Sequence, residues 1–241
     1  HLDRNNLDLS TFNYVVLDET DRMLDMGFSA PIAKIFDNVA VKRQTLLFSA
    51  TLPKGIEKAS AKYLNNPARI EIGQANSASQ NIVQTTEFVS KEGKFEALVH
   101  ALRQHEESAI VFMNSKFATE KLAKRLKASD ISASAIHGDL RQNKRERVIL
   151  GLRNNKFRVL VATDVAARGI DIPHIHQVIN FDLPRQTEDY IHRIGRTGRN
   201  GANGLALNLV TTADKGKLAE IDELLGGKPV TSSTKRSQRK P

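Results

Sequence analysis

Short apolar runs alternate with stretches of helical periodicity along most of this 241-residue chain. The first run, at residues 14–17, is followed by a helical stretch that begins near Ser29 and Pro31, and a second run follows at 45–48. Alternation of strands with helices is typical of parallel sheets, because a crossover helix carries the chain back to the starting edge of the sheet. The pattern therefore predicts an α/β fold, with parallel sheets whose faces are covered by helices.

The expected elements fall into two groups. The first group has strands at 14–17, 45–48 and 69–72 and a second helix from Pro53 to about residue 64. Three strands are too few to cover both edges of a doubly wound sheet, so we expect residues 1–72 to be the truncated end of a domain. The second group has the elements of a complete α/β domain: strands near 83–89, 109–112, 133–136, 158–162, 177–180 and 205–209, and helices near 94–104, 117–127, 142–152, 187–193 and 213–225.

Composition shifts mark the expected boundaries. Residues 73–81 are rich in Gly, Asn, Ser and Gln and contain no large apolar residue, so we predict a linker at 73–82 and a complete domain at 83–225. The last residues, 226–241, carry five Lys or Arg and no acid, which predicts a disordered basic tail. Such a tail either adds sequence-independent phosphate contacts or only aids solubility.

The charge and the amino-acid content narrow the class of protein. A net charge of +9 and a pI near 9.8 favour a polyanionic partner. The absence of cysteine excludes disulfides and thiolate metal sites, and no apolar run is long enough to span a membrane. We expect a cytoplasmic protein without a membrane partner. His174 and His176 are two residues apart, but without a second close pair they predict a loop before a strand rather than a zinc site.

Polar clusters follow the expected strands at their carboxyl ends, where parallel sheets bind ligands. Asp18 and Glu19 follow the first strand, and an acid pair in this position can hold hydrated Mg²⁺ and orient an attacking water. A solvated loop is the alternative interpretation. The other clusters are Ser49 with Thr51, Asn114–Ser115, His137–Gly138–Asp139, Thr163–Asp164 and Arg168–Gly169–Ile170–Asp171.

The stretch from His192 to Arg199 sets Arg193, Arg196 and Arg199 at a spacing of three residues. A guanidinium is a planar fork of donors that suits the oxygens of a phosphoryl group, and Gly195 and Gly198 would let the backbone come close to that ligand. A solvated basic turn is the alternative. If the acids of the first group and the arginines of the second meet around one triphosphate, the arginines would act as fingers on the developing charge.

Four longer motifs follow one another along the chain: Val16 to Phe28 with its Asp-Glu-Thr-Asp tetrad, Phe48–Ser49–Ala50–Thr51, Ala162 to Asp171, and His192 to Arg199. They occur in the order seen in DEAD-box RNA helicases, and the chain resembles that family over about residues 1–225, in particular its RhlE-like bacterial members. The resemblance implies RecA-like domains, here one truncated and one complete, ATP as substrate, Mg²⁺ and an RNA partner.

The resemblance also implies roles for individual residues. Asp18 would bind Mg²⁺ through water, and Glu19 would position the hydrolytic water. Asp21 would bridge to His192 and to Ser49 or Thr51, coupling the nucleotide site to domain closure. The remaining implied roles are nucleotide contacts for Gly169, Asp171, Arg196 and Arg199, a structural and interdomain role for Arg193, and RNA-backbone contacts for Asn114, Ser115, Gln142, Arg145 and Thr163.

Backbone contacts fix register without reading sequence, so we expect low RNA sequence specificity in a monomeric protein. Two features depart from the family pattern. Thr20 replaces the alanine of the name-giving tetrad, and no G-x-x-x-x-G-K-[ST] phosphate loop occurs in the chain. We therefore expect the natural protein to be longer at its N-terminus and this chain to hydrolyse little ATP alone. A non-catalytic RNA-binding module and a DNA-directed helicase are the alternatives.

Overall fold

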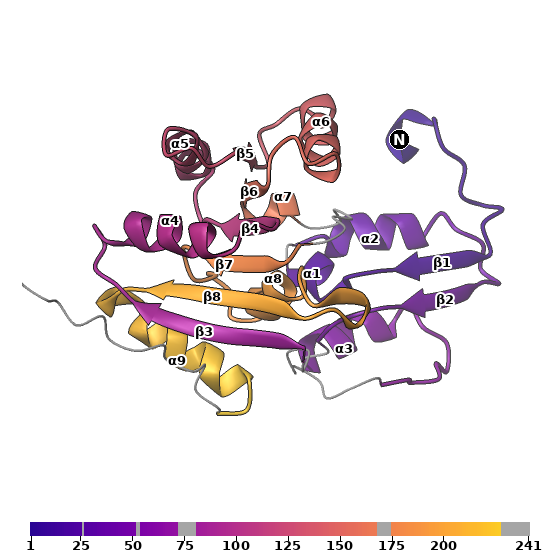
Figure 1. Ribbon diagram of the computed structural model, residues 1–241. Coiled ribbons are helices and arrows are strands. Elements are labelled where there is room, and N and C mark those ends of the chain that lie inside the picture. The colour runs from indigo at the N-terminus through magenta and orange to yellow at the C-terminus, as the bar shows by residue number, and fades with distance from the viewer. Residues whose placement is uncertain (26, 52–53, 72–80, 168–174, 228–241) are drawn as a thin grey trace, which may run out of the picture. The chain divides into compact units, whose positions relative to one another are not determined.

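The computed structural model describes residues 1–25, 27–51, 54–71, 81–167 and 175–227 (Figure 1). The chain divides into two compact units, residues 1–76 and 77–241, called unit 1 and unit 2 below. Each has its own parallel sheet, of two strands in unit 1 and six in unit 2. The α/β fold predicted from the sequence is confirmed. No helix within the described residues is both long enough and apolar enough to cross a bilayer.

Unit 1 is a small parallel sheet with helices. Strands β1 (Tyr14–Leu17) and β2 (Gln44–Leu47) pair in parallel, and the other elements are η1 (Leu2–Arg4), α1 (Thr20–Asp25), α2 (Ser29–Phe36) and α3 (Lys54–Ala61). The core contains Leu17, Ile32 and Phe36, with the Phe36 ring stacked on Tyr63 at 4.3 Å between centroids. Alternate β1 side chains face solvent, because Tyr14 and Val16 are 66% and 57% exposed.

The strand expected at 69–72 is absent from residues 69–71; Ile72 lies outside the described residues. Ile70 is 81% exposed, and Arg69 forms ion pairs with Glu57 and Glu71 at 3.2 and 2.9 Å. A strand needs a hydrogen-bonded neighbour, and the sheet of unit 1 has only β1 and β2 within the described residues. The apolar pattern here therefore belongs to an exposed segment without regular secondary structure.

Unit 2 is built on a six-stranded sheet in the order β3-β8-β7-β4-β6-β5, in which every pair is parallel. Four-residue central strands of wholly apolar sequence, such as AIVF in β4, are buried on both faces. The strands are β3 (Ile82–Phe88), β4 (Ala109–Phe112), β5 (Ala133–Ile136), β6 (Val159–Ala162), β7 (Gln177–Asn180) and β8 (Gly204–Val210).

Helices cover the sheet of unit 2 through separate apolar clusters. One cluster joins α4 (Lys94–Gln104) and α5 (Lys116–Lys127) to strand residues such as Val111 and Val161. Another joins α6 (Gln142–Arg153) and α7 (Asp164–Ala167) to Ile110 and Leu160, and a third joins α8 (Asp189–Ile194) and α9 (Lys215–Leu224) to β8. Since Ile110 and Val111 belong to different clusters, successive β4 residues pack on opposite faces.

The sequence missed two short α-helices, α1 and α7, and expected the last helix from residue 213. The structure instead has a 3₁₀ turn, η3 (Thr212–Asp214), directly before α9, with a second such turn, η2 (Arg199–Gly201), after α8. The η3 turn begins with a reciprocal cap, in which Asp214 accepts hydrogen bonds from the Thr211 backbone and hydroxyl.

Candidate functional site

The acid pair of unit 1 sits on a strained turn between β1 and α1. Asp18 is exposed directly after the last β1 residue, and Glu19 has a left-handed backbone with φ of 51°. The Glu19 backbone N–H donates to Asp18 Oδ1 at 2.8 Å. A non-glycine residue in this region costs energy and persists only where the surroundings impose it, often at functional sites. The turn therefore presents both carboxylates at the carboxyl end of β1.

Asp21 is the buried centre of a small polar network in unit 1. Its side chain is 2% exposed, and its Oδ2 accepts hydrogen bonds from Thr51 N at 3.0 Å and Thr51 Oγ1 at 2.7 Å. Ser49 Oγ accepts a bond from the Asp21 backbone N–H at 3.2 Å. The structure thus contains the contacts expected between Asp21 and the Ser-Ala-Thr stretch. The expected coupling through His192 stays a prediction.

Thr20, the residue that departs from the family tetrad, is fully buried at the start of α1. Its hydroxyl donates to the Leu17 carbonyl at 3.2 Å, and its backbone N–H donates to the Phe48 carbonyl at 3.1 Å. The added hydroxyl therefore has a partner, which removes the main cost of burying it.

The residues expected to contact RNA lie on neighbouring loops of unit 2 or, for Gln142 and Arg145, on the first turn of α6, which follows one of these loops. These loops follow β4, β6 and β5, which are adjacent in the sheet, so they meet at the edge formed by the strands' carboxyl ends, called the carboxyl edge below. Lys116 donates to Asp139 at 2.6 Å, which joins the loops after β4 and β5. The structure brings five sequence-predicted residues to this edge: Asn114, Ser115, Gln142, Arg145 and Thr163.

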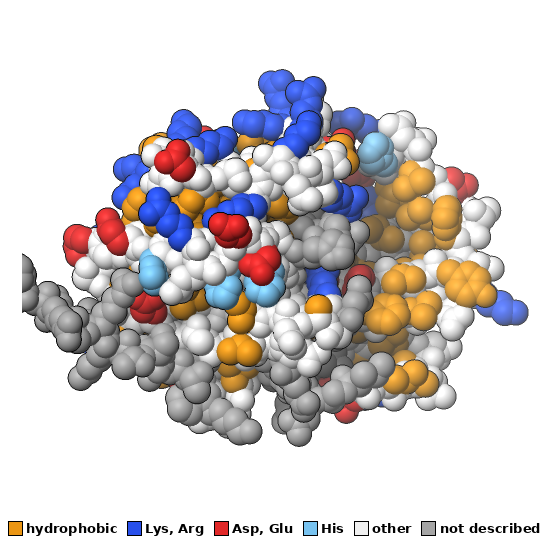
Figure 2. Space-filling view, in the orientation of Figure 1, with side chains coloured by type: hydrophobic (Ala, Val, Ile, Leu, Met, Phe, Trp, Pro, Cys, Tyr) orange, Lys and Arg blue, Asp and Glu red, His pale blue; other side chains and the backbone are white. Residues whose placement is uncertain are grey.

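Within this group the side chains differ in what they offer. Gln142 is exposed and donates to Glu146 at 3.0 Å, whereas Arg145 is half-buried and donates to the Ala166 carbonyl at 3.3 Å. Thr163 is only 9% exposed, and its carbonyl accepts the first backbone bonds of the α7 turn. Figure 2 shows Lys and Arg side chains gathered over α5 and α6, which flank these loops.

Arg193 is buried in unit 2 and uses all its donors. It is 1% exposed and binds both carboxylate oxygens of Asp164, at 2.6 and 2.8 Å. It also donates to Asn180 Oδ1 at 3.0 Å, to the Asp182 carbonyl at 2.6 Å and to Asn114 Oδ1 at 3.1 Å. The guanidinium therefore ties α8 to the loops after β4, β6 and β7.

The segment after α8 holds the other two arginines. Arg196 is half-buried, while Arg199 is exposed and its Nε donates to the Gly195 carbonyl at 3.0 Å. Gly198 has φ of 66°, and a Cβ there would lie 2.7 Å from an Ile82 side-chain atom. Packing inside unit 2 is thus sufficient to require glycine at 198. The reason expected from the sequence was different, namely that glycine would let the backbone come close to a phosphate ligand.

Family sequence models match both units. The model of the DEAD/DEAH box helicases covers residues 1–59, and that of the helicase conserved C-terminal domain covers residues 93–201. In the structure of E. coli DEAD-box protein SrmB bound to regulator of ribonuclease activity A, the matching chain is 37% identical, with a TM-score of 0.61; the match covers 66% of this chain and 97% of that one. The chain belongs to the DEAD-box helicase family.

Other members give the extent of the match. ATP-dependent RNA helicase DeaD of Mycobacterium tuberculosis (strain ATCC 25618 / H37Rv) is 44% identical over 224 residues, which are 92% of this chain and 39% of that protein. The structure of S. cerevisiae Dbp5 bound to RNA and ADP BeF3 has a TM-score of 0.88 and 32% identity, covering 96% of this chain and 62% of that chain. This DEAD-box chain therefore spans about two fifths of the DeaD sequence that it matches.

The nucleotide site expected from the sequence draws on residues of both units. Gly169 and Asp171 lie outside the described residues. The expected meeting of Asp18 and Glu19 with Arg196 and Arg199 joins unit 1 to unit 2, and it stays a prediction.

Sequence reasoning missed a buried polar network in this DEAD-box chain. Asn208 accepts a hydrogen bond from Asn180 at 2.8 Å and donates to the Tyr190 hydroxyl at 3.1 Å, and that hydroxyl donates to Gln84 at 2.9 Å. Burial raises the pKa of Tyr190 to about 12, although the Asn208 hydrogen bond opposes that shift. The signal for this network was Asn at otherwise apolar positions of two strands, at 180 and 208.

Proposed function

We propose that this chain forms part of an ATP-dependent RNA helicase, which couples ATP binding and hydrolysis to RNA binding and local duplex unwinding. The observation that carries the proposal is the strained Asp18–Glu19 turn, placed directly before the buried Asp21–Thr51 network. A carboxylate pair held by such a turn can bind the Mg²⁺ that accompanies a nucleotide and orient a water. The hydrogen bonds of the adjacent Asp21–Thr51 network can then change when the nucleotide binds.

The donor set of the turn fits Mg²⁺, which prefers oxygen ligands and keeps several of its waters. Exposed Asp18 leaves room for those waters and would hold the ion through them. When bound with ATP, Mg²⁺ neutralises charge on the phosphate oxygens. Glu19 would orient the attacking water, and Arg196 and Arg199 would stabilise the charge that develops on the transferred phosphoryl group. Gly169 and Asp171 would contact the nucleotide.

RNA is proposed to bind across the carboxyl edge of unit 2, through Asn114, Ser115, Gln142, Arg145 and Thr163. The adjacency of the strands that these residues follow supports this, as does the RNA bound in the similar structure of S. cerevisiae Dbp5. We propose that the contacts go to the sugar-phosphate backbone, so that duplexes of different sequence bind alike.

The salt dependence of RNA binding tests whether this surface contacts RNA phosphates. Arg145→Ala should reduce the magnitude of the negative slope of log affinity against log salt by about 0.7 for single-stranded RNA, because one phosphate contact is lost. Lys156→Ala removes the same charge from an exposed position at the opposite end of β6 and should leave the slope unchanged. Equal slopes for Arg145→Ala and the parent protein would contradict this placement.

Activity is tested in the helicase that carries this chain, by measuring ATP hydrolysis with and without RNA. Glu19→Gln should reduce RNA-stimulated turnover by at least about 100-fold, because general-base or water-positioning groups contribute that much, while RNA binding persists. Turnover of Glu19→Gln within a few-fold of the parent would remove Glu19 from the mechanism.

A second candidate function is a non-catalytic RNA-binding module. The observation in its favour is that the chain contains no G-x-x-x-x-G-K-[ST] stretch. The chain alone should then bind RNA and hydrolyse little ATP. RNA-stimulated hydrolysis by residues 1–241 alone would contradict the requirement for a phosphate loop.

The subfamily, the cellular location and the oligomeric state are proposed from the sequence. From the sequence pattern we propose a bacterial, RhlE-like member that works in the cytoplasm as a monomer. Sedimentation of the intact helicase tests the oligomeric state, and a concentration-dependent dimer would contradict it.

A further inference from the structure

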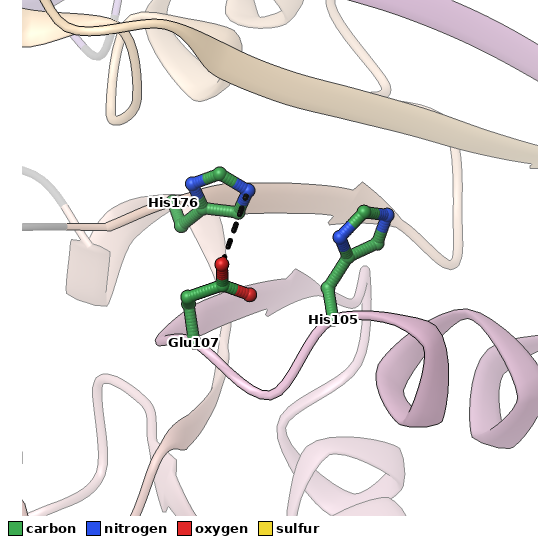
Figure 3. A group of neighbouring side chains, drawn as sticks. All are labelled: His105, Glu107 and His176. Carbon is green, nitrogen blue, oxygen red and sulfur yellow. Dashed lines mark ion pairs between the residues drawn. The ribbon is translucent and has the colours of Figure 1, made fainter.

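Three side chains with metal-binding atoms lie together in unit 2: His105 and Glu107, two residues apart, and His176, which comes much later in the sequence. His105 follows α4, Glu107 lies in the turn before β4, and His176 directly precedes β7. β4 and β7 are paired, so their starts lie side by side. Figure 3 shows the His176 ring facing the Glu107 carboxylate, with the His105 ring beside them.

This group is separate from the residues assigned to RNA. Asn114 and Thr163 follow their strands, whereas His105, Glu107 and His176 precede theirs. In a parallel sheet these positions lie at opposite edges. The edge where the strands begin, called the amino edge below, thus carries a cluster that the nucleic-acid mechanism does not use.

The ligand atoms are close enough to share an ion. One from each residue lies within 4.8 Å of the others, and His176 Nε2 lies 4.0 Å from Glu107 Oε1. Bonds of about 2.0–2.2 Å in a tetrahedral site put ligand atoms about 3.4 Å apart. The largest separation must therefore close by about 1.4 Å, which a rotation of partly exposed side chains can provide.

The backbone beneath the cluster is already fixed. Arg158 donates to the carbonyls of His105 at 3.0 Å and Glu107 at 3.5 Å. The His176 N–H donates to the Ser108 carbonyl at 3.0 Å, and its carbonyl accepts the Thr197 hydroxyl at 2.8 Å. Binding an ion then restricts only the rotation of side-chain torsion angles, which keeps the entropic cost small.

We propose that His105, Glu107 and His176 form a binding site for a divalent transition-metal ion, with Zn²⁺ the best match. Two imidazoles and one carboxylate are a ligand set that Zn²⁺ accepts, whereas Mg²⁺ and Ca²⁺ prefer oxygen alone. The carboxylate is exposed and His176 is one-third exposed, so an ion reaches the site from solvent and retains a water as its fourth ligand.

The rival interpretation is a surface ion pair between His176 and Glu107, for which 4.0 Å is a long contact. An ion pair has no need of His105 and no affinity for metal. Titration of the chelator-treated chain with ZnCl₂, followed by calorimetry, separates the two interpretations. The parent chain should take up Zn²⁺, and His105→Ala, Glu107→Gln and His176→Ala should each lose at least about 10-fold in affinity.

His100→Ala is the matched control, because His100 is an exposed histidine on α4, outside the cluster. It should bind Zn²⁺ as the parent does. Thermal melting of each metal-free variant checks that it is folded, and Glu107→Gln changes only an exposed side chain. Co²⁺ in place of Zn²⁺ should give the visible absorption of a tetrahedral ion, and excess Mg²⁺ should not displace it.

The proposal is overturned if the parent chain takes up no Zn²⁺, or if folded His176→Ala and Glu107→Gln bind it as tightly as the parent. Equal losses in His100→Ala would also overturn it, because binding would then belong to other histidines. Failure of this site leaves the proposed helicase function untouched, since the two sets of residues do not overlap.

Discussion

Replacing Arg193 should destabilise unit 2 more than replacing any exposed arginine. Its guanidinium is 1% exposed and makes five hydrogen bonds, two of them to Asp164. Arg193→Ala leaves the Asp164 carboxylate without its positive partner and removes the donor from three carbonyl or amide oxygens, those of Asn180, Asp182 and Asn114. Removing one partner of a buried ion pair costs about 3–5 kcal/mol.

A loss of this size is a large share of the stability of an ordinary domain, about 5–15 kcal/mol. Since about 1 kcal/mol shifts the melting temperature of a unit this size by roughly 2–4 °C, the midpoint should fall by about 10 °C. Arg193→Lys should also destabilise, because an ammonium group cannot hold Asp164 in a bidentate pair.

Urea and thermal unfolding followed by circular dichroism measure the effect. Arg185→Ala, an exposed arginine just before α8, is the control and should change the free energy of unfolding by less than about 0.5 kcal/mol. The double variant Arg193→Met with Asp164→Asn should be more stable than the sum of the single losses predicts. An Arg193→Ala loss below about 1 kcal/mol would refute this account of the buried pair.

Three further predictions concern single positions. Gly198→Ala should cost about 2–4 kcal/mol in chemical unfolding, because its φ is left-handed and the new Cβ would meet Ile82 at 2.7 Å. The control is Gly201→Ala, whose φ of +78° is also left-handed but whose Cβ would enter open space, so it should show only the backbone cost of about 1–2 kcal/mol. Thr20→Ala should change stability by less than about 1 kcal/mol, because the lost hydroxyl bond is offset by better helix propensity, and a larger loss in the same assay would contradict this. Burial would raise the pKa of Asp214, but hydrogen bonds from Thr211 and the nearby Lys94 hold that pKa below the ordinary value of 3.8. The parent should therefore be more stable than Asp214→Asn above pH 3.8 and lose this advantage as the pH falls further. A difference in stability that grows on acidification would contradict the sign.

Strands such as β4 and β6 were predictable because each is a short, wholly apolar run. The same rule misplaced a strand at 69–72, since an apolar pattern does not say whether a neighbouring strand is available to pair with it. The helices α1 and α7, of six and four residues, are too short to produce a helical period.

The candidate site was predictable only in part. Polar residues after strands gather at one edge of a parallel sheet whatever the strand order, so Asn114 and Thr163 could be placed near each other. The sequence could not show that Arg193 is buried and Arg199 exposed. The arginines are equally spaced, so their spacing does not reveal that α8 ends at Ile194, between them. The His105–Glu107–His176 group was out of reach, since it depends on β4 and β7 being neighbours, which spacing does not encode.

The burial of Arg193 is better explained by its holding α8 in one position on the sheet than by a gain in the free energy of unfolding. Well-packed apolar residues often replace buried ion pairs without loss, so the pair with Asp164 is no argument for stability by itself. An apolar side chain, however, would let α8 rotate or slide over the sheet, whereas the five donors of Arg193 are satisfied in one placement only. Thr197 adds a second fixed point through the His176 carbonyl. Arg196 lies between these anchors, so its backbone position follows from bonds made by its neighbours.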